Sequence, residues 1–307
     1  MSQTLLLLVL LSLSLNSAQA LVIPASSEVT DSTPVKLELE DTQTPKQDDR
    51  KKETEKFITE GKGVWVNIWN YPKDMTAFTA RLKKFNVDTV YLQINRSTTP
   101  VFSHQKELDA ILKAAHQNDI KIIGWSYCYL RDINTDVRKF VEPALYVSPD
   151  GEKLDGMAAD IEENYSLTTV KSYTDKIKAK LPKDYPLIAI VFSPEIKANY
   201  PWEYIANNWD VLMPMTYWHG LKGRDNDRVY KFVKDSIVSL RKLTKKDDLK
   251  IHLITDGDRT YSKEVQISLK AAQELGVNAG VSIYPEHLAS DEMLDIMKDF
   301  NCITCGT

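Results

Sequence analysis

Two acidic residues stand close together after an apolar stretch in the segment LDGMAADIEENY, residues 154–165. Only Ile161 separates Asp160 from Glu162, so in an extended strand both side chains point to the same face. Burial and mutual repulsion can raise the pKa of one such carboxyl group, which then keeps its proton near neutral pH and acts as a general acid. The alternative interpretation is a pair of ordinary surface acids in a loop that caps the next helix.

The residues before this pair indicate where it lies. Ala158 shares the face of Asp160 and Glu162, whereas Met157 and Ile161 belong to the opposite face. The larger apolar side chains fit a sheet surface that is covered by helices, and the other face fits the interior of a barrel. Barrel enzymes place their chemistry at the carboxyl ends of the strands. We therefore predict that both acids project into the mouth of a barrel.

Eight short runs rich in apolar, β-branched or aromatic residues alternate with segments of helical periodicity. The runs lie at residues 64–70, 89–95, 121–127, 154–165, 187–192, 211–217, 251–256 and 280–284. The helical stripes comprise Leu108, Ile111, Leu112 and Ala115, then Val229, Phe232, Val233, Ile237 and Leu240, and finally Met293, Ile296, Met297 and Phe300. This alternation predicts an α/β protein with a single (β/α)8 TIM barrel. A doubly wound open sheet is the alternative, but the Gly-x-Gly-x-x-Gly fingerprint of a dinucleotide site is absent.

Aromatic and polar side chains at the ends of several runs are candidates for substrate binding. Aromatic rings bind the apolar faces of sugars, and amide or carboxyl groups orient sugar hydroxyls. The candidates are Trp69, Asn70, Gln93, Tyr127, Trp218, Asp256 and Tyr284. Each alone is more often a packing, cap or turn residue, so the recurrence at strand ends is what favours a carbohydrate pocket.

The N-terminal segment predicts export. Residues 5–15 form an apolar run interrupted by two serines, and Ala18-Gln19-Ala20 matches a signal-peptidase site. No Lys or Arg precedes the run, which leaves an uncleaved anchor as the alternative. Residues 21–58 are polar and lack apolar periodicity, as in a disordered linker. We expect a signal peptide at 1–20, a linker at 21–58 and the barrel at 59–307, with no membrane span after cleavage.

Charge and metal-ligand patterns argue against several other functions. The formal net charge of −4 gives no support to nucleic-acid binding. The five histidines lack the i, i+4 helical pairing of common zinc motifs, so we expect neither a metal nor another cofactor. Cys302 and Cys305 lack the context of a redox or zinc motif, and a small disulfide would suit an exported chain. Cys128 is expected to pack as an apolar residue.

The fourth run resembles the active-site strand of glycoside hydrolase family 18, the chitinase-type barrels, whose motif is Asp-Gly-x-Asp-x-Asp-x-Glu. The matching string is DGMAADIE, residues 155–162, in which Ala158 replaces the middle Asp. The resemblance implies that Glu162 is the catalytic acid/base. It also implies that Asp160 orients the N-acetyl group of the substrate, whose oxygen attacks the anomeric carbon.

The sixth run carries a second part of this resemblance. The string MTY, residues 215–217, is similar to the family's Met-x-Tyr, which implies that Tyr217 hydrogen-bonds the N-acetyl group. Trp218 stands where the family usually has Asp, and Tyr284 where a Trp is expected. An Asp-x-Glu on a barrel strand is also similar to family 25 lysozymes, which cleave peptidoglycan.

These features predict a secreted or periplasmic glycoside hydrolase that acts by carboxylate acid/base catalysis. The resemblance implies an N-acetylhexosamine substrate such as peptidoglycan or chitin, and hence proximity to a cell wall or cell surface. The alternative is a carbohydrate-binding barrel that has lost turnover, which the substitution at Ala158 motivates.

Overall fold

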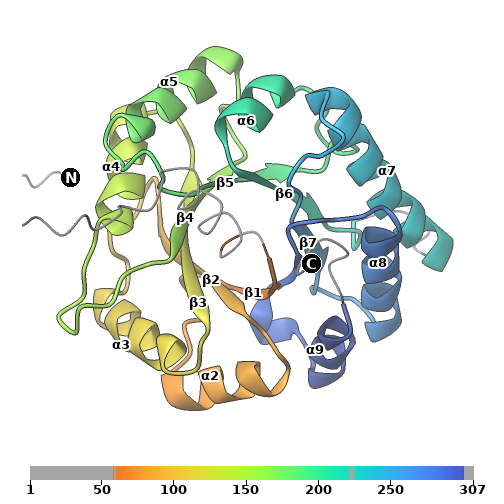
Figure 1. Ribbon diagram of the computed structural model, residues 1–307, viewed down its shortest axis with the longest axis horizontal. Coiled ribbons are helices and arrows are strands. Elements are labelled where there is room, and N and C mark those ends of the chain that lie inside the picture. The colour runs from red at the N-terminus through yellow and green to blue at the C-terminus, as the bar shows by residue number, and fades with distance from the viewer. Residues whose placement is uncertain (1–57, 59, 221–224, 301–307) are drawn as a thin grey trace, which may run out of the picture. The chain divides into compact units, whose positions relative to one another are not determined.

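Eight parallel strands close into a barrel in the computed structural model (Figure 1). The structure describes residue 58 and residues 60–220 and 225–300, which all fall within one compact unit of the chain. The strands are β1 (Lys62–Val66), β2 (Thr89–Arg96), β3 (Lys121–Cys128), β4 (Gly156–Ile161), β5 (Leu187–Phe192), β6 (Val211–Thr216), β7 (Leu253–Asp256) and β8 (Val281–Tyr284). Strand β8 pairs with β1, so the predicted (β/α)8 barrel is confirmed. The expected signal peptide, and the linker apart from Ile58, lie outside the described residues.

Helices surround the barrel and alternate with the strands (Figure 1). They are α2 (Met75–Lys84), α3 (Gln105–His116), α4 (Ile133–Ala144), α5 (Leu167–Lys178), α6 (Trp202–Asn208), α7 (Asn226–Thr244), α8 (Ser262–Glu274) and α9 (Asp291–Lys298), with a 3-10 turn, η1 (Glu286–Leu288). The predicted stripes of α3 and α7 are buried. The stripe of the last helix is buried at Met293 and Met297, but α9 ends before Phe300. None of the helices from α2 to α9 is long and apolar enough to cross a membrane.

Strand β1 ends earlier than the apolar run 64–70 suggests, because Asn67 begins a tight turn. Its side-chain oxygen accepts hydrogen bonds from the backbone N–H of Trp69 at 3.1 Å and from the Asn70 amide at 2.9 Å. Such local bonding of an Asn side chain competes with strand pairing. The turn brings Trp69 to the rim of the barrel, where its side chain is 68% exposed.

Strand β4 separates two apolar cores. Met157, Ala159 and Ile161 pack in the layer between the sheet and the helices, whereas Ala158 belongs to the cluster inside the barrel. The two-residue period of a strand accounts for this division. The predicted phase of β4 is therefore confirmed, and the side chain of Asp160 projects inward.

The barrel interior below the mouth is filled by large side chains. Trp65 stacks on Tyr91 with ring centroids 4.2 Å apart, and a Cβ atom at Gly63 would overlap the Tyr91 ring. Ile58 is 3% exposed and packs in the same inner cluster as Tyr91 and Ile123. The sequence assigns Ile58 to the linker, whereas its apolar side chain gains burial inside the barrel. Ile58 therefore packs as part of the barrel core.

Acidic residues close the amino ends of the strands in a repeated pattern. An Asp directly precedes β2, β4 and β6, and its carboxylate accepts a hydrogen bond from a backbone N–H of the strand before it. The pairs are Asp88 with Lys62 at 2.8 Å, Asp155 with Ile122 at 2.6 Å and Asp210 with Leu187 at 2.8 Å. Asp155, the first residue of the chitinase-type motif, therefore lies at the opposite end of β4 from Glu162.

Candidate functional site

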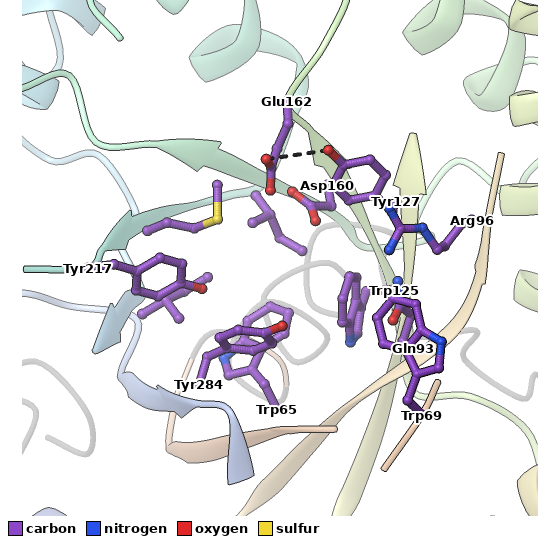
Figure 2. A pocket seen from close by; sticks show the side chains of 13 residues that line it. Trp65, Trp69, Gln93, Arg96, Trp125, Tyr127, Asp160, Glu162, Tyr217 and Tyr284 are labelled. Carbon is purple, nitrogen blue, oxygen red and sulfur yellow. Dashed lines mark hydrogen bonds between the residues drawn. The ribbon is translucent and has the colours of Figure 1, made fainter. Parts of the chain in front are cut away.

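A cavity of about 240 Å³ opens at the carboxyl ends of the strands (Figure 2). Its lining residues come from all eight strands or from positions one to three residues after a strand. They are Trp65, Trp69, Gln93, Arg96, Trp125, Tyr127, Asp160, Glu162, Ile190, Met215, Tyr217, Ile254 and Tyr284. The structure thus brings together all three predicted catalytic residues with Trp69, Gln93, Tyr127 and Tyr284.

Asp160 is the more deeply placed of the two acids. It lies one residue before the end of β4 and is 5% exposed. Its Oδ1 atom is buried and has no hydrogen-bond partner among the described residues. Burial raises the pKa of Asp160 well above its usual range, and the negative charge of Glu162 raises it further.

Glu162 follows β4 directly and faces Tyr127 of β3. The Tyr127 hydroxyl donates to Oε2 of Glu162 over 3.5 Å (Figure 2). Burial raises the pKa of Glu162, whereas hydrogen bonds from Asp160 and Tyr127 and the charge of Arg96 act in the opposite direction. Asp160 and Glu162 therefore titrate as a pair that retains a proton at a pH where two isolated carboxylates would hold none.

Two tyrosines line the cavity on the side of β6 and β8, away from Tyr127 (Figure 2). The rings of Tyr217 and Tyr284 are stacked, with centroids 5.7 Å apart. Burial raises the pKa of Tyr217 well above its usual range, and the nearby Tyr284 adds to this effect. Tyr217 therefore keeps its phenolic proton and can donate a hydrogen bond to a ligand.

Two tryptophans, Trp65 and Trp125, form the base of the cavity. Trp65 donates its indole N–H to Ser282 at 2.7 Å, and Trp125 donates to the Tyr91 carbonyl at 3.2 Å. Their rings meet edge to face at 5.8 Å. Because both polar atoms are already bonded, the rings offer apolar surface to a ligand. Neither residue was among the sequence candidates, although both occupy inward-facing positions of predicted strands.

Arg96 is the charged residue that the sequence candidates omit. Its guanidinium lies over the Tyr127 ring at 4.5 Å and over the Trp69 ring at 5.3 Å (Figure 2). The pairing of β2 with β3 shifts between Gln93 and Asn95, so that Arg96 pairs with Tyr127. A simple two-residue period would turn Asn95 inward with Gln93, whereas the shift turns Arg96 inward instead.

Three predicted binding residues are not among those that line the cavity. Trp218 is fully buried in the outer core, where burial of a large ring is favourable. Asn70 donates to Asn67 within the turn after β1. Asp256 accepts hydrogen bonds from the backbone N–H of His219 at 2.8 Å and of Asp258 at 3.0 Å, so it fixes two loops.

Gln93 has a second role besides lining the cavity. Its side-chain oxygen accepts the backbone N–H of Ile68 at 3.1 Å, and its backbone carbonyl accepts the hydroxyl of Tyr71 at 2.7 Å. These bonds fix the segment that carries Trp69.

The described residues contain no cluster of metal-ligating side chains. Within residues 60–220 and 225–300, no three His, Cys, Asp or Glu side chains are placed to hold a metal ion together. Cys128 is buried as expected, whereas Cys302 and Cys305 lie outside the described residues.

The fold is similar to that of several solved glycoside hydrolases. No known family model matches the chain, and no curated protein is similar to it in sequence. The structure of a GH18 chitinase from Pseudoalteromonas aurantia is 12% identical, with a TM-score of 0.55 over 78% of this chain and 98% of that one. The spore cortex-lytic enzyme SleL of Bacillus megaterium is 10% identical, with a TM-score of 0.56 over 78% and 73% of the two chains.

A plant protein shows the same likeness. The chitinase ICChI from Ipomoea carnea is 15% identical, with a TM-score of 0.53 over 78% of this chain and 100% of that one. Sequence identities this low establish the barrel fold and leave the activity to be argued from the site. The predicted resemblance to chitinase-type barrels is thereby confirmed at the level of the fold.

Proposed function

We propose that the protein is a glycoside hydrolase that cleaves a glycan containing N-acetylhexosamine. The observation that carries this proposal is the buried pair Asp160–Glu162 at the mouth of an aromatic-lined barrel, where burial raises the pKa of both carboxyl groups. A protonated carboxyl group at this position is what the departure of a sugar oxygen requires. The solved neighbours that are named as chitinases and as a spore cortex-lytic enzyme support the choice of substrate.

The proposed reaction assigns one task to each of three side chains. Glu162 donates its proton to the glycosidic oxygen, and the bond from that oxygen to the anomeric carbon breaks. The oxygen of the neighbouring N-acetyl group forms the new bond to the anomeric carbon. Asp160 accepts the N–H of that group and Tyr217 donates to its oxygen. Water then attacks the anomeric carbon and gives a proton to Glu162 while the bond from that carbon to the N-acetyl oxygen breaks, which restores both the N-acetyl group and the resting acid.

The surroundings of the pair fit these tasks. Oδ1 of Asp160 has no partner among the described residues, so it is available to accept the amide N–H of a substrate. The rings of Trp65 and Trp125 lie at the base of the cavity and provide a surface for a sugar or acetyl group. The full arrangement supports catalysis more than simple binding, because a binding site gains nothing from a buried acid that it must keep protonated.

A catalytically inactive carbohydrate-binding barrel is the second candidate. Ala158 lies on the inward face of β4 below Asp160, where the chitinase-type motif carries an acid. Its methyl group belongs to the inner apolar cluster, so Glu162 is the remaining acid next to Asp160 in the cavity lining. Under this second proposal the pocket binds the glycan without turnover.

Release of soluble products from purified peptidoglycan and from chitin oligomers distinguishes the two proposals. The full chain is compared with Glu162→Gln and with a matched control, Glu163→Gln. Glu163 is adjacent in sequence but pairs with Arg131 at 2.7 Å and does not line the cavity. Product release by the wild type and by the control, but not by Glu162→Gln, supports the glycosidase. Binding of both glycans by folded wild type without any release favours the binding barrel.

Export to the periplasm or the cell exterior is a separate proposal, supported by the sequence of residues 1–20. Expression of the full chain in a Gram-negative host, followed by fractionation and mass spectrometry of the N-terminus, tests it. Cleavage after Ala20 supports the proposal. A full-length protein retained in the membrane fraction indicates an uncleaved anchor.

A further inference from the structure

Arg96 is a cation in the cavity that forms no direct ion pair with a described acidic residue. Among the described residues, no carboxylate lies within ion-pair distance of its guanidinium, and its one hydrogen bond to another side chain is to the Tyr129 hydroxyl at 3.4 Å. Two other arginines of the barrel do pair with acids. Arg81 pairs with Glu286 at 2.6 Å, and Arg131 pairs with Glu163 at 2.7 Å. A guanidinium placed in a pocket with free N–H groups is ready to bind an anion.

Two aromatic rings hold this guanidinium in place. Trp69 and Tyr127 both lie within 5.3 Å of it, at the rim and on the wall of the cavity. Rings over the guanidinium cover its faces and leave the in-plane N–H edge available, which is the edge that a planar carboxylate binds in a bidentate manner. The stacking also limits the side chain's freedom before a ligand arrives, which lowers the entropy cost of binding.

Arg96 lies close to the acid pair, because Tyr127 contacts both Arg96 and Glu162. Tyr127 contacts Arg96 through its ring and Glu162 through its hydroxyl. A sugar bound at Glu162 therefore lies next to the guanidinium. Balancing the charge of the acid pair is the simpler role for Arg96, but that role needs only a nearby positive charge and does not need stacked rings or a free edge.

We propose that Arg96 binds a carboxylate group carried by the glycan, so that the pocket selects an acidic sugar over a neutral one. This inference rests on the proposed function and specifies its substrate class. The chemical class is an N-acetylhexosamine glycan in which a sugar next to the cleaved bond bears a free carboxylate.

The test uses one glycan with and without its charge. Peptidoglycan strands stripped of peptides carry free lactyl carboxylates, and methyl esterification of the same strands removes that charge. Binding of both forms is measured by calorimetry with the full chain carrying Glu162→Gln, so that the ligand is not consumed. Arg96→Gln and Arg131→Gln are added in turn. Arg131 is the matched control, because its guanidinium also lies over a tyrosine ring, that of Tyr129 at 5.5 Å. Unlike Arg96, its side chain is 71% exposed and already pairs with Glu163.

We expect the free acid to bind about 10- to 100-fold more tightly than the ester, as for a charge-assisted hydrogen-bonded pair. Arg96→Gln should abolish this preference, and Arg131→Gln should retain it. Equal affinity of the parent protein for both forms overturns the carboxylate proposal and leaves the glycosidase intact. Arg96→Gln weakening both forms equally also overturns it and assigns Arg96 to charge balance. Binding of neither form overturns the proposed substrate and this inference together.

Discussion

The two ends of strand β4 carry acidic residues in contrasting surroundings. Asp155, at the amino end, accepts a hydrogen bond from the Ile122 N–H at 2.6 Å and contacts Nε2 of His116 at 3.1 Å. Asp160, near the carboxyl end, is buried with one oxygen unpartnered among the described residues. The first carboxylate has two hydrogen-bonding partners. The second is kept in surroundings that oppose its ionisation.

This difference separates stability from chemistry along a single strand. Partnered carboxylates recur before β2, β4 and β6, where each anchors the start of a neighbouring strand. At the mouth, the barrel retains an acid pair that costs folding free energy and is useful only for catalysis or binding. Residues at the two ends should therefore respond differently to the same substitution, Asp to Asn.

Asp160→Asn should have the largest effect on activity. The amide removes the titrating proton of the pair and offers an N-acetyl N–H only a neutral, weaker acceptor, so we expect kcat to fall by about 10²- to 10³-fold. Because burial raises the folded-state pKa of Asp160, the ionised acid destabilises the fold above its unfolded pKa. The variant should thus be as stable as the wild type or more stable at pH 7, and this gain should vanish below about pH 4. Product release and thermal unfolding at both pH values check this prediction.

Asp155→Asn should have the reverse signature. The amide still accepts one hydrogen bond but loses the charge that His116 and the Ile122 N–H contact. We expect the free energy of unfolding to fall by about 1 to 3 kcal/mol, with kcat per folded molecule unchanged. Urea unfolding followed by activity measurements on the folded protein tests the contrast. A large loss of kcat without a loss of stability would show that the amino end also serves catalysis.

The sequence predicts the barrel and the catalytic pair because both follow from the two-residue period of strands. Alternation at 157–162 is enough to place Asp160 inward, and the resemblance to a chitinase-type motif indicates Tyr217. The sequence does not distinguish the roles within that motif. Asp155 matches the motif as well as Glu162 does, yet the length of β4 puts them at opposite ends of the barrel.

The sequence candidates and the cavity lining differ for separate physical reasons. The pairing shift between Gln93 and Asn95 turns Arg96 inward, and a shift of this kind has no signature in the residues themselves. Trp218 follows Tyr217 directly, so the inward position of one places the other in the outer core. Asp256 is an inward-strand acid by pattern, but the backbone of a distant loop at His219 uses its carboxylate.

The pH dependence of stability should show the contribution of His116, which contacts Asp155 at the amino end of β4. The hydrogen bond with Asp155, together with that to Glu152, raises the pKa of His116 to about 9. Its contribution is therefore complete below its unfolded pKa of about 6.5 and is lost as the pH rises through about 9. We expect about 1 to 2 kcal/mol for this partly exposed group. The free energy of unfolding of the wild type should fall between pH 7 and 10 by more than that of His116→Gln. Equal changes of this free energy with pH in the two proteins would contradict the assignment.

Trp69→Ala should give the smallest effect, confined to binding at the mouth. The ring lines the cavity and is 68% exposed, so its removal leaves the core intact while taking away a surface for a sugar and a support for Arg96. An aromatic contact of about 0.5 to 1.5 kcal/mol corresponds to a KM about 2- to 10-fold higher, with kcat and Tm unchanged. Tyr261→Ala is the matched control, because Tyr261 is 72% exposed and lies outside the cavity lining. A fall in kcat with constant KM would instead place Trp69 in the catalytic step, which would extend the chemical end of the barrel out to its rim.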